Sequence, residues 1–228
     1  MSGETLDVFV GHPTCKAFDI HLDDVPTRIF VAQGADFVST VLVGSETVWK
    51  GAEGERCTYL TVHFDGAERN NVLMVYLHKE SAGRPEHKLF KKVGGEWVNG
   101  EGFGASLVEL REKVDKVAHF TLEVGGAPVT QADFFEAQQF RVPTRFFFPK
   151  LGQHAVEVTF GGETVWKAEG ERVFLSKIHL KDGEPALLYI HGKKEDEGFS
   201  SVCFTPKDGK WEKIESKEYG AILATLKL

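Results

Sequence analysis

Short stretches in which apolar and polar residues alternate follow one another along almost the whole chain. In residues 59–64, for example, the apolar Leu60 and Val62 stand between polar neighbours. Alternation with a period of two is typical of β-strands that bury one face. Turns that contain Gly or Asp, such as residues 65–66, separate these stretches about every ten residues. The pattern predicts a mainly β protein, built as an antiparallel sandwich or a partly open, barrel-like sheet.

Two segments are expected to be helical instead. In residues 105–116, Leu107, Leu110 and Val114 recur at helical spacing and would lie on one face of a helix. A second, shorter helix is expected at residues 131–139. Each half of the chain is thus predicted to hold at most a short helix.

The alternating pattern occurs twice. The sequence G-S-E-T-V-W-K-G-A-E-G-E-R begins at Gly44, and G-G-E-T-V-W-K-A-E-G-E-R begins at Gly161. The motif V-P-T-R also recurs, 117 positions apart (142 minus 25). A repeat of this length is a domain rather than one unit of a solenoid. We therefore expect two tandem β-rich domains, residues 1–117 and 118–228.

The composition is that of an ordinary globular protein, with 42% hydrophobic and 27% charged residues among 228. The formal net charge is −7 and no long run of Lys and Arg occurs, so we expect no nucleic-acid partner. Neither a secretion signal nor an apolar stretch of about 18 residues is visible. Attachment to a membrane would therefore need an anchor that is absent from this chain.

The three cysteines, Cys15, Cys57 and Cys203, are an odd number, so at most one disulfide can form within the chain. None of them lies in a C-x-x-C pair, which argues against a zinc site. Two alternatives stay open. All three are buried or half-buried thiols, or Cys15 and Cys57 form a bridge.

Histidines recur at equivalent positions, His63 with His179 and His78 with His191. They lie on adjacent predicted strands, so two imidazoles could approach each other, and neutral imidazole is a common metal ligand. However, no Asp, Glu or Cys accompanies them at ligand spacing in both copies. We expect no metal or other cofactor, and histidines near strand ends on exposed or half-buried faces.

Carboxylates recur as well, Glu46 with Glu163 and Glu55 with Glu171, so an acid/base pair has to be considered. They are expected in solvated turns, with Glu55 forming a weak ion pair with the adjacent Arg56. No nucleophile-elbow, phosphate-loop or dinucleotide-binding motif is present. The sequence predicts no enzymatic activity and no catalytic residue.

Repeated tryptophans allow two interpretations. They are stacking platforms for sugar rings, or they fill the core while the indole N–H bonds a local carbonyl. Their fixed frame of apolar residues favours the core for Trp49, Trp166, Trp97 and Trp211. Replacing Trp49 or Trp166 by Ala is then expected to cost on the order of 3–5 kcal/mol.

Three consecutive phenylalanines, Phe146, Phe147 and Phe148, form part of one predicted strand. Because successive strand residues face opposite ways, at least one of these rings must point away from its own core. It would pack across the junction between the copies or form an exposed patch for a partner.

In their order along each copy, these motifs resemble the FAINT repeat of piroplasm parasites such as Theileria. That repeat has a V-I-W-x-A-x-x-G-E-like core and an F-K-x-x-G-x-x-W-like ending. The matching residues are Val48-Trp49 and Val165-Trp166 in the core, and Phe90 with Trp97 and Phe204 with Trp211 in the ending. The resemblance covers nearly the whole chain, and the tandem arrangement is similar to that of merozoite surface antigens.

The resemblance implies a non-enzymatic surface or secreted antigen, often held by a lipid (GPI) anchor and involved in host-cell contact or immune display. Its partners would be components of the host erythrocyte surface or membrane skeleton, and antibodies. Divergent charged loops at residues 79–85 and 192–198 are typical of a recognition scaffold. The alternative is a soluble module that binds a small apolar or glycan ligand in a β-sheet cavity lined by Phe and Leu.

Overall fold

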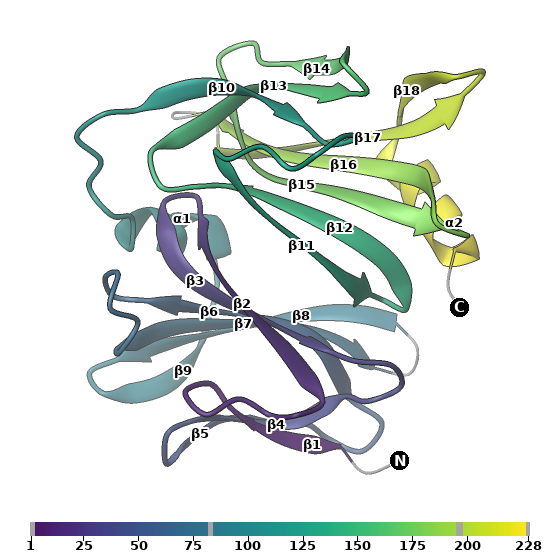
Figure 1. Ribbon diagram of the computed structural model, residues 1–228. Coiled ribbons are helices and arrows are strands. Elements are labelled where there is room, and N and C mark those ends of the chain that lie inside the picture. The colour runs from purple at the N-terminus through teal and green to yellow at the C-terminus, as the bar shows by residue number, and fades with distance from the viewer. Residues whose placement is uncertain (1–2, 82–83, 195–197, 227–228) are drawn as a thin grey trace. The chain divides into compact units, whose positions relative to one another are not determined.

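Two nine-stranded sheets make up most of the computed structural model. Figure 1 shows the arrangement of the strands within each sheet. The structure describes residues 3–81, 84–194 and 198–226. Two compact units divide the chain: Met1–Ile20 with Val25–Glu112, and His21–Asp24 with Lys113–Leu228. The prediction of a mainly β protein with two similar β-rich units and short helices is confirmed.

The same order of elements occurs in both halves of the chain. The first half contains β1 (Glu4–Asp7), β2 (Cys15–Leu22), β3 (Val25–Ala32), β4 (Val38–Val43), β5 (Glu46–Lys50), β6 (Arg56–Phe64), β7 (Val72–Ser81), β8 (Arg84–Val93), β9 (Glu96–Gly100) and α1 (Phe103–Glu109). The second half contains β10 (Ala118–Glu123), β11 (Ala132–Gln139), β12 (Val142–Pro149), β13 (Gln153–Phe160), β14 (Glu163–Lys167), β15 (Arg172–Lys181), β16 (Glu184–Lys194), β17 (Gly198–Lys207), β18 (Lys210–Ile214) and α2 (Ser216–Thr225).

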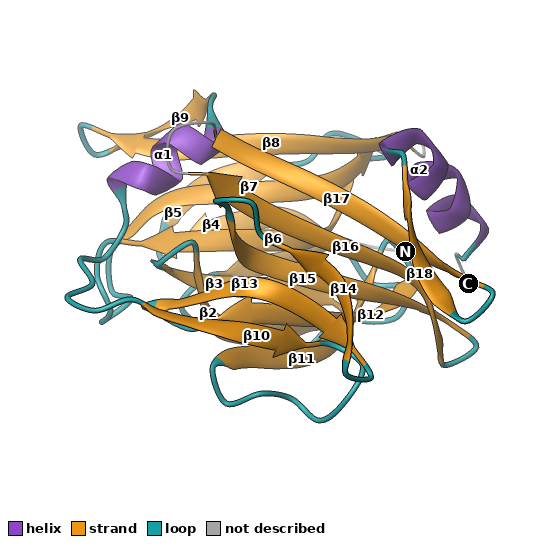
Figure 2. Cartoon of the chain, turned by 90° about the horizontal axis from the view of Figure 1, so that it is seen from above, coloured by secondary structure: helices purple, strands orange, loops and turns teal. Residues whose placement is uncertain are grey.

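Strand pairing is the same in both sheets. In the first, the path runs β1-β4-β6-β7-β8-β9, with β5 on β4 and β3 between β2 and β6. The first strand runs parallel to the fourth, whereas β4–β5, β6–β7 and β7–β8 are antiparallel. The second sheet repeats this as β10-β13-β15-β16-β17-β18. Figure 2 shows how strands dominate over the two helices.

The sixth strand changes its neighbour along its length, which makes the sheet curl. Cys57 lies opposite Val38 of β4, but Tyr59 lies opposite Val31 of β3. A bulge in the pairing with β7 falls between Cys57 and Tyr59, and bulges increase strand twist. In the second unit β15 does the same, with a bulge between Val173 and Leu175. One bulged strand therefore joins the two parts of each curled sheet.

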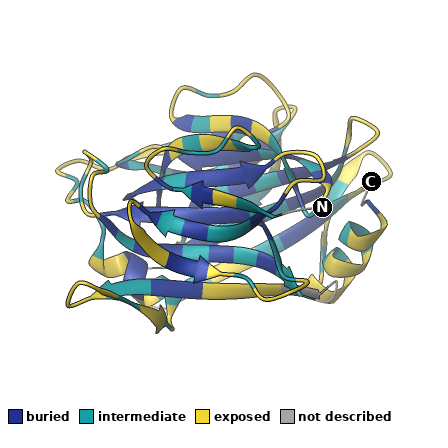
Figure 3. Ribbon diagram, turned by 90° about the horizontal axis from the view of Figure 1, so that it is seen from below, coloured by how far each residue is buried: buried dark blue, intermediate teal, exposed yellow. Residues whose placement is uncertain are grey.

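Each sheet encloses its own apolar core. In the first unit, alternate residues of β6 point into it, among them Leu60, Val62 and Phe64, and the intervening Thr61 and His63 face the other side. The buried positions run along the central strands, as the dark blue ribbon in Figure 3 shows. The alternation of apolar and polar residues therefore marks strands that bury one face in the core, as predicted.

The predicted helices need correction. The helix expected at residues 105–116 spans only Phe103–Glu109, and its last turn closes with a bond from the Leu110 N–H to the Leu107 carbonyl. Residues from Lys113 onwards group with the second unit, so the helix ends shortly before the chain leaves the first. An unpredicted helix, α2, follows β18.

The helix expected at residues 131–139 is wrong, because Ala132–Gln139 forms strand β11. All eight residues pair with β12. The ring of Phe135 stacks on those of Phe146 and Phe148, with centroids 4.9 and 5.7 Å away. Pairing and ring packing thus override the helix propensity of this segment.

The three consecutive phenylalanines are all buried. Phe147 belongs to the apolar core of the second unit, while Phe146 and Phe148 face the opposite side of the sheet and stack with Phe135. The prediction that at least one ring points away from its core is therefore confirmed, and the alternative of an exposed patch is wrong.

The cysteines are free thiols, with Cys57 and Cys203 buried and Cys15 half-buried. Burial raises the pKa of Cys57 to about 12 and also raises the pKa values of Cys15 and Cys203. Within the described residues, no helix has the length and apolar character needed to cross a membrane.

The tryptophans divide into one core residue and three at the margins of the cores. Trp49 is 3% exposed, and its indole nitrogen has no hydrogen-bond partner among the described residues. Trp97, Trp166 and Trp211 are half-buried and pack against the core clusters. The expected carbonyl partner is also wrong for Trp97, whose Nε1 donates to Glu46 Oε2 at 2.8 Å.

This difference predicts unequal effects of truncation. Trp49→Ala should lower the free energy of unfolding by about 3–5 kcal/mol, because it leaves a large cavity. Trp166→Ala should cost clearly less, because that ring is half-buried. Trp49→Phe should be tolerated best, since no indole hydrogen bond is lost. Urea unfolding of the three variants tests this order, and equal losses for Trp49→Ala and Trp166→Ala would contradict it.

Candidate functional site

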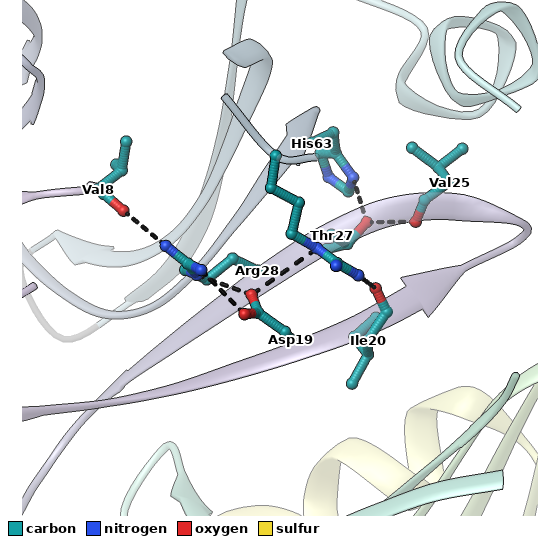
Figure 4. A network of polar contacts seen from close by, with 8 residues as sticks. Val8, Asp19, Ile20, Val25, Thr27, Arg28 and His63 are labelled. Atoms are coloured by element: carbon teal, nitrogen blue, oxygen red, sulfur yellow. Dashed lines mark hydrogen bonds and ion pairs between the residues drawn. The ribbon is translucent and has the colours of Figure 1, made fainter. Parts of the chain in front are cut away.

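The V-P-T-R motif of the first unit builds a buried polar network. Thr27 Oγ1 donates to the Val25 carbonyl at 2.9 Å and lies 2.9 Å from His63 Nδ1, as Figure 4 shows. Because the hydroxyl proton is used on Val25, Nδ1–H must donate to Thr27. His63 Nε2 then accepts from Thr61 Oγ1 at 2.9 Å. Both ring nitrogens of a neutral imidazole are satisfied.

The second unit repeats the network with one change. Thr144 Oγ1 donates to the Val142 carbonyl and lies 2.8 Å from His179 Nδ1. The other ring nitrogen, Nε2, lies 2.6 Å from the hydroxyl of Tyr219 in α2. The helix thus takes the part that Thr61 plays in the first unit.

Burial lowers the pKa of both His63 and His179 to about 3. The expectation that these histidines lie on exposed or half-buried faces is therefore wrong for this pair. It holds for His78 and His191, which are half-buried. The repeated histidines at 63 and 179 hold strands together as neutral hydrogen-bonding groups.

The strand register keeps His63 and His78, the repeated histidines of the first unit, apart. His78 lies opposite Tyr59, and His63 is four positions further along the same strand (63 minus 59), about 13 Å at 3.3 Å per residue. Each histidine contacts aromatic rings instead: His78 lies beside Tyr59 and Tyr76, and His191 beside Phe174. Among the described residues, no group of three or more His, Cys, Asp or Glu could hold a metal ion.

The arginine of the V-P-T-R motif pairs with a carboxylate on the neighbouring edge strand. Arg28 contacts both carboxylate oxygens of Asp19 in β2, at 2.7 and 2.9 Å (Figure 4). Arg145 contacts Glu136 in β11 at 2.8 Å. Neither acid was predicted from the sequence, although the alternation of Phe18, Ile20 and Leu22 is a local signal for strand β2.

The repeated glutamates do not form an acid/base pair. Glu46 accepts from Lys92 Nζ and from Trp97, while the equivalent Glu163 is exposed at the start of β14. Glu55 and Glu171 each accept a backbone N–H in their turns.

The ion pair of Glu55 is with the buried Lys79, not with the adjacent Arg56 as expected. The Arg56 guanidinium instead lies over the ring of Phe37.

A carboxylate that was not predicted as a functional residue ends the first strand of each unit, Asp7 in β1 and Glu123 in β10. Glu123 accepts backbone N–H groups from Gly125, Gly161 and Gly162 at 2.6–2.9 Å, and the Thr159 hydroxyl at 3.0 Å. Burial would raise its pKa, but these bonds outweigh burial and lower it. The carboxylate therefore fixes the β13–β14 turn, where Gly161 and Gly162 both have positive φ.

In the first unit Asp7 has the same place but fewer bonds. It accepts from the Phe9 N–H at 2.9 Å and from the Gly44 N–H at 3.4 Å. Its shorter side chain reaches only one amide of the β4–β5 turn. The acid at the end of the first strand, Asp7 or Glu123, is thus a turn clamp in each unit, and the clamp makes more hydrogen bonds in the second unit.

A cavity of the second unit has a volume of about 660 Å³. Seven of its ten lining residues are of polar or charged type, and the lining consists of His119, His154, Val156, Lys167, Ala168, Gly170, Glu171, Arg172, Lys193 and Lys194. Neither Phe nor Leu contributes to it, so the lining differs from that expected for an apolar ligand.

No protein-family model, curated protein or solved structure matches the chain. The likeness to FAINT repeats therefore stays a prediction from the motifs.

The buried histidines predict a loss of stability in acid. Their pKa is about 3 in the folded state and about 6.5 in the unfolded chain. As the pH falls below 6.5, only the unfolded chain takes up these protons. The free energy of unfolding should therefore fall by about 1.4 kcal/mol per pH unit for each histidine. Urea unfolding between pH 7 and pH 5 measures this slope.

The variants His63→Asn and His179→Asn should reduce that slope, whereas Val10→Ser, which changes an exposed side chain that does not titrate, should leave it unchanged. An unaltered slope in both buried variants would show that other groups cause the pH dependence.

The turn clamps predict unequal effects of neutralisation. Glu123→Gln should lower the free energy of unfolding of the second unit by about 2 kcal/mol, because an amide cannot accept all of these bonds. Asp7→Asn should cost less in the first unit. Thermal unfolding of both variants beside the parent protein compares them, and a larger loss for Asp7→Asn would refute the clamp.

Proposed function

We propose that this protein is a non-enzymatic recognition protein, displayed at a cell surface or secreted, that contacts components of a host erythrocyte. The proposal rests on the structural roles of the polar residues that the two units share. The threonine, histidine, arginine and carboxylate positions common to the two units hold strands and turns of their own unit. The polar residues common to both units therefore maintain the fold of each unit.

The resemblance to tandem FAINT repeats supports the host-contact part of the proposal. In proteins of that kind, a lipid anchor added outside such a segment would hold the units at the membrane, and exposed loops would meet host components and antibodies. The described parts of the β7–β8 and β16–β17 hairpins differ in sequence between the units, as a recognition surface would. Residues 82–83 and 195–197 of these loops lie outside the described residues.

A specific contact surface is suggested by the turn after β1. Phe9 is 42% exposed and Val10 is 84% exposed. The corresponding turn of the second unit contains Gly125, Gly126 and Ala127 instead. An exposed aromatic side chain such as Phe9 adds nothing to the core, whereas aromatic residues are enriched in protein interfaces. We therefore place host contact at the Phe9-Val10 turn.

The test is direct binding of the labelled chain to intact erythrocytes and to membrane-skeleton extracts. Saturable binding is expected, weakened at least about tenfold by the double variant Phe9→Ser/Val10→Ser. Val108→Ser removes an apolar side chain of similar exposure on α1 and should bind as the parent does. Absence of saturable binding to both preparations would contradict the proposal. If Val108→Ser weakens binding as much as the double variant does, the Phe9-Val10 turn is not the specific contact.

The alternative of a module for small apolar ligands gains no support from the polar lining of the second unit's cavity. A glycan would suit that lining better. If soluble glycans compete with erythrocytes for binding to the protein, host-cell contact and glycan binding use the same site.

A further inference from the structure

The cavity of the second unit, about 660 Å³ in volume, is lined by residues of β10, β13, β14, β15 and β16 and by the turn at residues 168–171. Small-molecule sites in proteins commonly have volumes of about 300–1,000 Å³. The charged lining residues are Lys167, Glu171, Arg172, Lys193 and Lys194, with a formal charge of +3 (4 minus 1). The cavity is therefore large enough for a small ligand and rich in groups that form hydrogen bonds.

The first unit has a lysine where the second unit has a glycine beside this cavity. Lys79 of β7 lies opposite Cys57, and Gly192 of β16 lies opposite Val173. A bulge follows at the same place in both strand pairs, so positions 79 and 192 are equivalent. The second unit therefore lacks the side chain that the first unit has at this position.

In the first unit this lysine occupies a carboxylate of the neighbouring turn. Lys79 is 2% exposed and forms an ion pair with Glu55. The equivalent Glu171 lines the cavity and accepts, among the described residues, only the backbone N–H of Glu169. A Cβ atom at Gly192 would lie 3.7 Å from Glu171 Cγ, so a side chain there would extend toward this carboxylate. The missing lysine thus leaves both space and a hydrogen-bond acceptor on the cavity wall.

Two further exchanges change the chemistry of the same wall. Lys193 takes the place of Glu80, because each lies opposite the arginine of its own unit. His154 takes the place of Phe37, since the residues that follow them pair equivalently. An acid is thus replaced by a cation and an apolar ring by an imidazole. The first unit has the same fold without these residues, so the fold does not require them.

Two cations of the wall bind carboxylates of the same unit. Arg172 contacts Asp23 at 2.6 Å and Asp24 at 3.2 Å, and Lys193 lies 3.6 Å from Asp23. With both aspartates counted, the formal charge of the set is still positive, at +1 (3 minus 2). Lys167 is exposed and forms no ion pair with any described residue. A further carboxylate in the cavity would therefore be attracted to Lys167.

We propose that this cavity binds a saccharide that carries a carboxylate. Sugar hydroxyls donate to Glu171, which as a carboxylate can only accept, and the acidic group of the sugar pairs with Lys167. An apolar ligand would leave these polar groups without partners, which is unfavourable. The proposal gives the glycan alternative a site and a ligand class. It does not depend on host-cell contact at the Phe9-Val10 turn.

Calorimetric titration of the complete folded chain with sialyllactose, a trisaccharide with one carboxylate, tests the proposal. Lactose is the matched neutral sugar. Sialyllactose should bind saturably at one site per chain. Lactose should bind at least about tenfold more weakly, because it lacks the charge-assisted contact with Lys167. Absence of saturable sialyllactose binding, or equal binding of the two sugars, would overturn the proposal.

Variants of the wall locate the site. Gly192→Lys restores the residue of the first unit and should abolish binding, because its ammonium group can reach Glu171. Gly192 has no positive φ, but a Cβ there would lie 3.3 Å from the Arg172 carbonyl oxygen. Thermal unfolding therefore has to show that this variant folds.

A second variant and a control avoid dependence on that substitution. Lys167→Ala changes an exposed side chain and should weaken sialyllactose binding about tenfold. Lys181→Ala, at the exposed end of β15 and outside the cavity lining, should bind as the parent does. Parent-like binding by Lys167→Ala would contradict the proposed site. Erythrocyte binding of the same variants is measured separately, so loss of host-cell contact and loss of sugar binding can be told apart.

Discussion

A hydrogen bond between a buried threonine hydroxyl and a buried imidazole sets the strand register in both units. Thr27 lies directly opposite His63, and Thr144 opposite His179. A shift by one residue would turn the histidine into the apolar core and leave two polar groups unpaired. The strand that carries the histidine also joins the two parts of its curled sheet, so this one contact positions the neighbours on either side.

Alternating hydrophobicity and turn glycines were enough to predict the β class and most hairpins, because these signals are local. The edge strand β11 could not be found this way, since its conformation depends on pairing with β12 and on the stacking of Phe135. The repeated histidines were recognised, but not their burial, because the threonine partner of His63 lies 36 positions away. Helix α2 did leave a local signal in Tyr219, Ile222, Leu223 and Leu226.

Comparison of equivalent positions in the two units distinguishes residues that the fold requires from residues that it tolerates. Where the units agree, as at the motif threonines and arginines, the side chain has a structural partner in each. Where they differ, the structure has been adjusted: Lys177 lies at the position of Thr61, and Tyr219 supplies the hydrogen bond to the histidine. The exposed Phe9-Val10 turn has no apolar equivalent in the second unit. Under the proposed function, recognition would depend on these differences rather than on the shared motif.

The parallel pairing of β1 with β4 affects how the chain reaches this structure. Leu6 finds its partner Val41 only after 35 more residues are in place (41 minus 6), and the second unit has the same requirement. Strand β10 ends in T-L-E where β1 ends in T-L-D, so both strands can compete for the edge of β4. Synthesis from the N-terminus favours the correct choice, because β1 can close the first unit before β10 leaves the ribosome. When the complete chain refolds, β1 and β10 are present at the same time. Strand β10 can then pair with β4 in place of β1.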